Sequence, residues 1–420
     1  MNSPTLADRH ILAYGVLGLP LAFAALPLYM HVPHHYAAVS GLSLAWLGAL
    51  LLGARLVDAA IDPWLGWLAD RLPRRRLLAL ALPLFGGGFV LLLHPPATPL
   101  AAAGWLLGSL LLTYLGYSAA TVAYQAWGAD LADAAWLRTR LTAAREGFGL
   151  LGVVLAAALP TLLAAELDEG LRRLGWLLPP LMLVAMTIAF AGVGQRPAQR
   201  LSHRPLGPSL RRVLADPPFR RLLLVFVANG FAAALPATLF LFFVADVLGD
   251  AATSGLYLAI YFLAGAASLP AWLRLAARYG RVGSWLAAMA LSVVAFAGAG
   301  LLDSGDRWPF ALICLASGLA LGADLALPAA MAADHGERLG QAGACFGVWN
   351  FVAKLNLALA AGLALPLLGA LGYQPGGDAG RAVLTAAYAY WPLACKLLAA
   401  GLLWRWRHSL EREIPRCANG

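Results

Sequence analysis

Charged residues are scarce in this sequence of 420 residues. Only 12% of its residues are Asp, Glu, Lys or Arg, whereas 61% are hydrophobic; in an average soluble chain about a quarter are charged and about half are apolar. Lysine is nearly absent, since Lys354 and Lys396 are the only two, and the basic excess of 30 over 21 acidic residues therefore rests on arginine. These deficits exclude a soluble globular protein and a disordered chain. They leave a polytopic membrane protein.

Cysteine and clustered histidine are equally sparse. The four cysteines stand singly, at Cys314, Cys345, Cys395 and Cys417, which excludes a disulfide scaffold and any metal-ligand or redox-motif spacing. The only histidine cluster, His31, His34 and His35, has no nearby carboxylate to complete a catalytic site, which argues against an integral-membrane enzyme. We expect no cofactor and no metal beyond a coupling cation.

Long apolar runs dominate what the sequence does contain. A helix needs about 20 apolar residues to cross the hydrocarbon core, and twelve runs are long enough: 10–31, 42–69, 77–94, 100–128, 141–165, 172–193, 220–245, 252–274, 282–302, 307–333, 341–370 and 382–404. The first run is too long for the apolar part of a signal peptide, so we expect it to be an uncleaved span. The sequence predicts an all-α membrane protein with twelve transmembrane helices.

Arginine gathers in alternate connections between the runs, as at residues 71–76, 138–140, 196–221, 274–281 and 405–416. By the positive-inside rule this places both termini in the cytoplasm, so the net charge of +9 indicates membrane orientation and not nucleic-acid binding. The most polar connection predicts a cytoplasmic linker over 195–218 between two pseudo-symmetric six-helix halves, 1–194 and 219–408, with a cytoplasmic tail over 409–420. The segment 272–281 (WLRLAARYGR) weakly repeats 66–74, and the alternative is that short cytoplasmic loops are rich in arginine anyway.

The second run carries ionisable residues at membrane depth. Asp58 and Asp62 are four residues apart and lie on one helical face. Two carboxylates so close in a low-dielectric site repel each other unless a cation lies between them, which predicts a Na⁺ or H⁺ site. The alternative is a static ion pair between one Asp and Arg55.

The two lysines have different predicted roles. Lys354 lies within the eleventh run and needs a carboxylate partner, for which Asp58 or Asp62 is the best candidate. Lys396 lies towards the cytoplasmic end of the twelfth run, where we expect it to extend to the membrane surface as a structural residue.

A polar stripe follows the fourth run at helical spacing: Tyr114, Tyr117, Ser118, Thr121, Tyr124 and Gln125. Such a stripe faces a cavity or a neighbouring helix, and its Ser and Thr hydroxyls are oxygen ligands that Na⁺ accepts.

In the fifth run, Arg145 and Glu146 form either a cavity-lining pair that handles substrate or a cytoplasmic gate. Single polar residues in later runs are expected to make interhelical hydrogen bonds: Asn229, Asp324, Asn350 and Asn356.

A charged cluster follows the second run: Asp70, Arg71, Arg74 and Arg75. It lies at the predicted membrane surface, where it can pair with helix ends of the other half. We interpret it as a conformational latch and topology anchor that gates one side of the membrane.

These residues resemble a known family over nearly the whole chain. The segment 66–75 resembles the loop signature of the major facilitator superfamily, and Arg55, Asp58, Asp62, residues 117–126, Arg145 and Lys354 resemble its glycoside-pentoside-hexuronide:cation symporters. The resemblance implies that Asp58 and Asp62 bind the coupling cation with help from Ser118, that Lys354 links the cation and substrate sites, and that Arg145 contacts substrate. From their positions in the runs we also expect Thr121 at the cation site, Arg55 among the coupling residues, and Tyr117, Thr121, Gln125 and Lys354 at the substrate site.

The chain departs from the sugar-transporting members at three places. Thr121 replaces a carboxylate, Gln125 replaces a tryptophan, and Leu21-Ala22 replaces a Lys-Asp pair. The paired acceptors that sugar hydroxyls need are therefore missing. We expect a monomeric symporter in the bacterial inner membrane that couples Na⁺ or H⁺ to a small organic solute, with membrane lipid as its surroundings. A lipid, drug or efflux carrier of the same fold is the alternative.

Overall fold

The computed structural model describes residues 7–24, 27–28, 32, 36, 44–96, 99–132, 134–164, 166–193, 202, 204–376 and 379–411. These residues form helices and no β-strand. The chain folds into two compact units: unit 1 comprises Met1–Val213 and Ala333–Phe351, and unit 2 comprises Leu214–Ala332 and Val352–Gly420. The predicted division at the 195–218 linker stays a prediction. His31, His34 and His35 lie outside the described residues.

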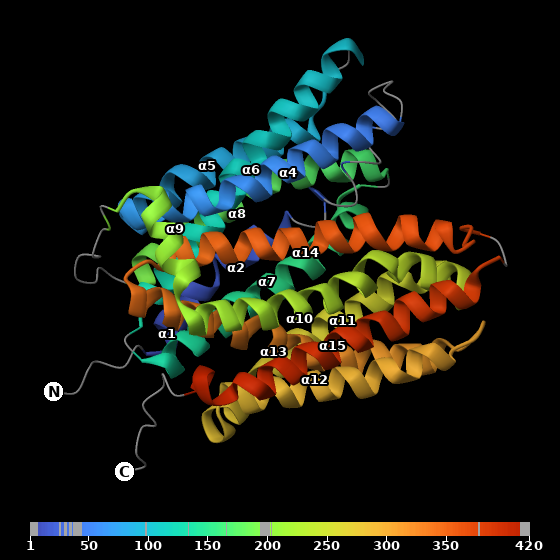
Figure 1. The fold of residues 1–420 in the computed structure, drawn as a ribbon. Coiled ribbons are helices and arrows are strands. Elements are labelled where there is room, and N and C mark those ends of the chain that lie inside the picture. Colours follow the sequence, from blue (N-terminus) through green and yellow to red (C-terminus); the bar gives the residue numbers. More distant parts are fainter. Residues whose placement is uncertain are drawn as a thin grey trace. The chain divides into compact units, whose positions relative to one another are not determined.

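Unit 1 holds the helices of the N-terminal part of the chain: α1 (Asp8–Gly15), α2 (Gly18–Phe23), α4 (Leu44–Arg71), α5 (Arg74–Leu93), α6 (Pro99–Asp130), α7 (Ala135–Leu163), α8 (Leu167–Val193) and most of α9 (Leu206–Ala215). Helices α5 and α6 pack side by side, with α4 against α6 (Figure 1). Glycine permits this packing, because a Cβ at Gly116 would lie 2.4 Å from the backbone nitrogen of Phe85. A helix with a side chain at this position could not approach α5 so closely.

Unit 2 contains α10 (Pro217–Phe242), the π-helix η2 (Phe243–Val247), the 3₁₀-helix η3 (Ala251–Thr253), α11 (Ser254–Tyr279), α12 (Arg281–Ala297), η4 (Gly298–Leu301), most of α13 (Arg307–Leu339) and α14 (Ala342–Ala370), and α15 (Arg381–Glu411). Its buried core centres on aromatic rings. Phe243 stacks on Tyr388 with ring centroids 4.0 Å apart, and Phe310 packs against both. This cluster joins α13 and α15 to the end of α10.

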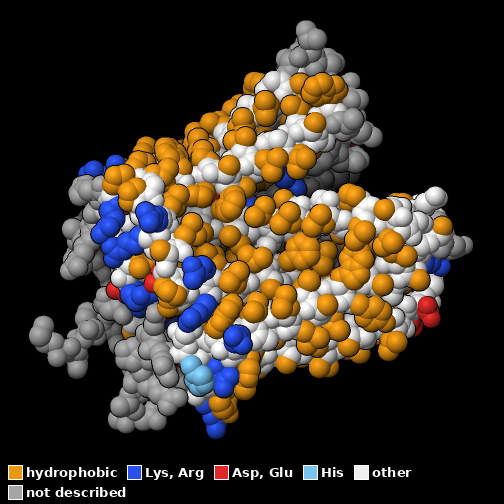
Figure 2. Space-filling view, viewed as in Figure 1, with side chains coloured by type: hydrophobic (Ala, Val, Ile, Leu, Met, Phe, Trp, Pro, Cys, Tyr) orange, Lys and Arg blue, Asp and Glu red, His pale blue; other side chains and the backbone are white. Residues whose placement is uncertain are grey.

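Ten of the described helices are long and apolar enough to cross a membrane. Helix α4 has 28 residues but carries Arg55, Asp58 and Asp62 in its middle, and the first predicted run is described only in part, as α1 and α2. Ten apolar helices plus these two segments agree with the twelve predicted spans. Hydrophobic side chains cover the visible face of α10, α11 and α15, as expected of helices in contact with lipid (Figure 2).

The predicted repeat coincides with equivalent helix junctions in the two units. Helix α5 begins at Arg74, three residues after α4 ends, and α12 begins at Arg281, two residues after α11 ends. Both arginines are the first residues of their helices and both are 5% exposed. The same junction with a buried arginine therefore occurs twice in the chain.

A buried acid joins four helices of unit 2. Asp324 on α13 accepts hydrogen bonds from Lys396 on α15 at 2.5 Å, from the Trp285 indole on α12 at 2.7 Å and from the Asn229 amide on α10 at 3.3 Å. The predicted interhelical role of Asp324 and Asn229 is confirmed. The expectation for Lys396 is wrong, because its side chain is 7% exposed and pairs with Asp324 instead of extending to the surface. A buried carboxylate offsets the cost of placing the ammonium in an apolar bundle.

We expect Lys396→Met to destabilise unit 2 by about 3 to 5 kcal/mol, because it leaves Asp324 charged and buried without a counter-charge. Adding Asp324→Leu to this variant removes the second charge and should restore most of the lost stability. Thermal unfolding of the detergent-purified protein, followed by tryptophan fluorescence, measures both variants. A double variant no more stable than Lys396→Met would show that the ion pair is not the cause.

Candidate functional site

The two carboxylates of α4 are buried within unit 1. Asp58 is 5% exposed and Asp62 is fully buried. The Ser118 hydroxyl on α6 donates a hydrogen bond to Oδ1 of Asp58 at 2.7 Å, so α6 supplies a ligand-bearing side chain to the acid pair. Carboxylate and hydroxyl oxygens are the donors that a hard cation prefers. The structure brings three of the four predicted cation-site residues together.

The fourth residue, Thr121, lies one turn beyond Ser118 on α6. Its hydroxyl oxygen is buried and interacts with the phenol of Tyr117, one turn earlier on the same helix. A bound ion would therefore have to share the Thr121 oxygen with Tyr117.

Arg55 lies on α4 near the acid pair, as the sequence predicts, and interacts with the phenol of Tyr114 on α6. Asp58 is thus contacted by a neutral hydroxyl and lies near an arginine that α6 also engages. A cation site and a static ion pair with Arg55 both remain compatible with this geometry.

The predicted substrate residues of α6 face different neighbours. The Tyr117 ring packs edge-on against Phe85 of α5, with centroids 5.5 Å apart. The Gln125 amide oxygen accepts a hydrogen bond at 2.9 Å from Asn350 of α14, which confirms the interhelical role of Asn350. Gln125 can therefore meet a substrate only if it releases Asn350 or binds through its own amide NH₂ group.

In unit 2, Asn356 donates a hydrogen bond to the Phe226 carbonyl oxygen at 3.5 Å.

Arg145 on α7 is 7% exposed and is held by its neighbour in sequence. Its Nε and Nη2 atoms both donate to one oxygen of Glu146, at 3.0 and 2.5 Å. Tyr14 and Tyr124 lie close enough to interact with the guanidinium. The pair carries no net charge, so an anionic ligand would have to compete with Glu146 for Arg145.

Asp70 caps the start of α14. Its two carboxylate oxygens accept hydrogen bonds from the backbone amides of Gly343 at 2.7 Å and Ala344 at 2.8 Å, and Arg74 donates to it at 2.9 Å. The first amides of a helix lack partners within the helix and carry partial positive charge. A carboxylate from α4 therefore satisfies a helix that lies 273 residues later in the chain.

Three glycines make this cap possible. A Cβ at Gly343 would lie 2.3 Å from the Gly66 carbonyl oxygen, and a Cβ at Gly347 would lie 2.5 Å from the Asp62 carbonyl oxygen. The two helices touch by backbone, one and two turns from Asp70. Any side chain at these positions would push α14 away from the carboxylate.

The other predicted gating arginines bind elsewhere in unit 1. Arg71 stacks over Trp67 and donates to the Arg204 carbonyl oxygen at 3.0 Å. Arg75 donates to the Phe190 carbonyl oxygen at 2.6 Å. Within the predicted latch Arg74 donates a hydrogen bond to Asp70, and Arg74 also pairs with Asp130 at 3.0 Å.

Sequence reasoning missed a second ion pair in unit 1. Arg138 at the start of α7 donates to Asp334 near the end of α13 at 2.5 Å and lies 3.5 Å from Glu337. In the sequence, the arginine-rich segment 138–140 indicated only the orientation of the chain in the membrane. The acidic pair three residues apart on α13 is the signal that could have indicated a partner.

Lys354 belongs to unit 2 and is partly exposed. Its predicted partnership with Asp58 or Asp62 stays a prediction. Within the described part of the chain, no group of three His, Cys, Asp or Glu side chains is placed to hold a metal ion.

Comparisons with known proteins identify the family and the fold of this chain. The family described as MFS/sugar transport protein matches residues 11–412. A bacterial homologue of the iron transporter ferroportin has a similar fold, with a TM-score of 0.73, 16% identity, and coverage of 95% of this chain and 98% of its own. The human organic anion transporter MFSD10 has a TM-score of 0.71 and 19% identity, and the match covers 96% of this chain and 100% of MFSD10. The Escherichia coli fucose:proton symporter has a TM-score of 0.70 and 14% identity, and the match covers 95% of this chain and 98% of the symporter. At these identities the three structures establish the fold alone.

We expect Asp70→Ala to speed deuterium exchange of the Gly343 and Ala344 amides by about 5- to 100-fold, because it removes the acceptor of two buried donors. Mass spectrometry of overlapping peptides that begin at or before residue 340 and include residues 343 and 344 measures this rate. Arg75→Gln is the matched control, since Arg75 contacts Phe190 and not Asp70. Equal exchange in Asp70→Ala and the parent protein would contradict the cap.

Proposed function

We propose that this chain, which belongs to the MFS/sugar transport protein family, is a symporter that uses a Na⁺ or H⁺ gradient to move a small organic solute. It is an integral multi-pass membrane transporter with the major facilitator fold and not an enzyme. The observation that carries cation coupling is the buried acid pair of α4 with Ser118 hydrogen-bonded to Asp58.

The coupling mechanism follows from electrostatics. With both carboxylates ionised, repulsion between Asp58 and Asp62 is relieved by a bound cation or by Lys354. When a cation occupies the pair, Lys354 is released to reorganise the substrate site, which raises substrate affinity. Linkage then requires substrate to tighten cation binding by the same factor, about 5- to 150-fold.

We expect Asp58→Asn and Asp62→Asn each to abolish cation-driven accumulation of substrate while sparing some downhill exchange, because the ligand charge is lost but the cavity remains. Uptake into proteoliposomes, with and without an imposed Na⁺ or H⁺ gradient, measures this. Glu169→Gln is the control, since Glu169 is exposed on α8 and pairs with Arg173 outside the acid pair and the proposed gate. Accumulation in both α4 variants equal to that of the parent would mean that the pair is structural.

The substrate class is proposed from the polar residues of unit 1. Thr121 and Gln125 supply fewer acceptors than a polyhydroxylated sugar needs, and Gln125 is engaged by Asn350. A site that leaves sugar hydroxyls unpaired binds them weakly. Arg145, once Glu146 gives way, suits an anionic or more apolar solute.

In an uptake panel we expect neutral sugars to be carried weakly and organic anions to be carried better, with Arg145→Gln reducing anion uptake more than sugar uptake. Radiolabelled solutes in the same proteoliposomes provide the measurement. Tight binding of a disaccharide by the parent protein would refute this assignment. Transport of lipid or drug without any cation gradient would instead favour the alternative of a lipid, drug or efflux carrier.

The cap at Asp70 is proposed to gate one side of the membrane. Because the Asp70 oxygens hold the first amides of α14, opening requires these hydrogen bonds and the nearby backbone contact with Gly66 to break together. Arg74 supports the carboxylate, while Arg71 and Arg75 anchor the same junction. We place this end in the cytoplasm and the protein in the inner membrane, since the α4 to α5 junction is rich in arginine.

A further inference from the structure

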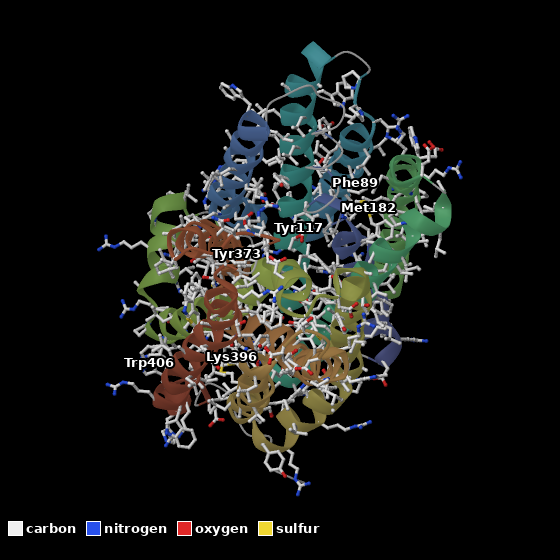
Figure 3. The ribbon with its side chains drawn as sticks, turned by 90° about the vertical axis from the view of Figure 1, so that its right-hand side faces the viewer. Phe89, Tyr117, Met182, Tyr373, Lys396 and Trp406 are labelled. Atoms are coloured by element: carbon white, nitrogen blue, oxygen red, sulfur yellow. The ribbon has the colours of Figure 1, made fainter. Side chains whose placement is uncertain are left out.

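A groove runs between α5 and α8 in unit 1. Its volume is about 560 Å³, within the range of about 300 to 1,000 Å³ that is typical of ligand sites. Apolar side chains and glycines line it, among them Gly86, Gly87 and Val90 from α5 and Trp176, Met182 and Leu183 from α8. Figure 3 labels Met182 of α8 and Phe89 of α5, the two helices that form the groove.

Glycines of α5 create the space. Gly88 packs against Thr113 of α6, where a Cβ would lie 2.7 Å from the Thr113 nitrogen. A Cβ added at Gly86 would be in ordinary contact with Met182 and Pro179 of α8. A Cβ added at Gly87 would meet no atom within 4 Å. A glycine inside a helix costs about 0.5 to 1 kcal/mol relative to alanine. Gly88 offsets this cost by close packing with α6, while Gly87 keeps the groove open.

One end of the groove carries an aromatic ring and a positive charge. Trp176 is 63% exposed and packs edge-on against His94, with ring centroids 5.4 Å apart. Arg172 precedes Trp176 by four residues and so lies on the same face of α8. Arg173 pairs with Glu169 at 2.9 Å, and the side chain of Arg172 is exposed.

This arrangement matches the chemistry of one class of molecule. Tryptophan and arginine near the end of a transmembrane helix occupy the lipid headgroup region, and the apolar residues beyond them lie among acyl chains. An arginine at that depth attracts a phosphate. We propose that the groove binds an acyl chain of an anionic phospholipid whose headgroup phosphate pairs with Arg172.

Native mass spectrometry of the delipidated full-length protein tests this site with phosphatidylglycerol and phosphatidylcholine that carry the same acyl chains. The parent protein should bind phosphatidylglycerol about fivefold more tightly, the effect of one arginine near a membrane surface. Arg172→Gln should abolish this preference, and Arg211→Gln, which changes an exposed arginine on α9, should retain it.

Filling the groove tests the acyl-chain half of the site. Gly87→Leu should lower the occupancy of both lipids severalfold, whereas Gly104→Leu should leave it unchanged, because a Cβ at Gly104 on α6 also meets no atom within 4 Å. Leu183→Phe narrows the groove from the α8 side and replaces Gly87→Leu if that variant unfolds.

The proposal fails if the parent binds both lipids equally or if neither groove variant changes occupancy. A photoactivatable phosphatidylglycerol should label the peptide that contains residues 176–186. Labelling confined to other peptides would also overturn the site. None of these readouts depends on transport, so the outcome is independent of whether the proposed symport is correct.

Discussion

A charge buried among apolar helices requires a partner on another helix, and this requirement organises both units. Asp324 collects donors from α10, α12 and α15, so one carboxylate fixes how four helices of unit 2 meet. Asp70 does the same in unit 1 for α14 and the start of α5. Each acid would cost several kcal/mol without its donors. The polar contacts therefore determine which helices pack together, although apolar surface supplies most of the buried area.

Glycine determines how closely the helices approach. At Gly66, Gly343 and Gly347 the backbones of α4 and α14 come into contact, and this proximity brings the amides of α14 within reach of Asp70. The end of α13 and the start of α14 belong to unit 1, while the rest of both helices belongs to unit 2.

The fold and the function rest on different observations. The family match establishes a transporter, and the similar structures establish its fold. A fold hosts many substrates, so substrate and coupling have to come from the site. Here the site offers two buried carboxylates, one hydroxyl bound to Asp58 and a neutralised arginine. The proposed cation coupling rests on this donor set, which specifies no particular solute.

The sequence by itself determined the helices and the spacing along each one. The predicted run 341–370 became α14 at Ala342–Ala370, and the placement of Asp58 and Asp62 on one face follows from the helical period, because helix hydrogen bonds join residues four apart. Only the tertiary structure decided which side chains meet between helices. Lys396 is buried against Asp324, Gln125 binds Asn350, and Arg75 turns to Phe190 and away from Asp70. These contacts depend on how each helix is rotated and how closely glycine lets it approach, and no periodicity within a single helix specifies either.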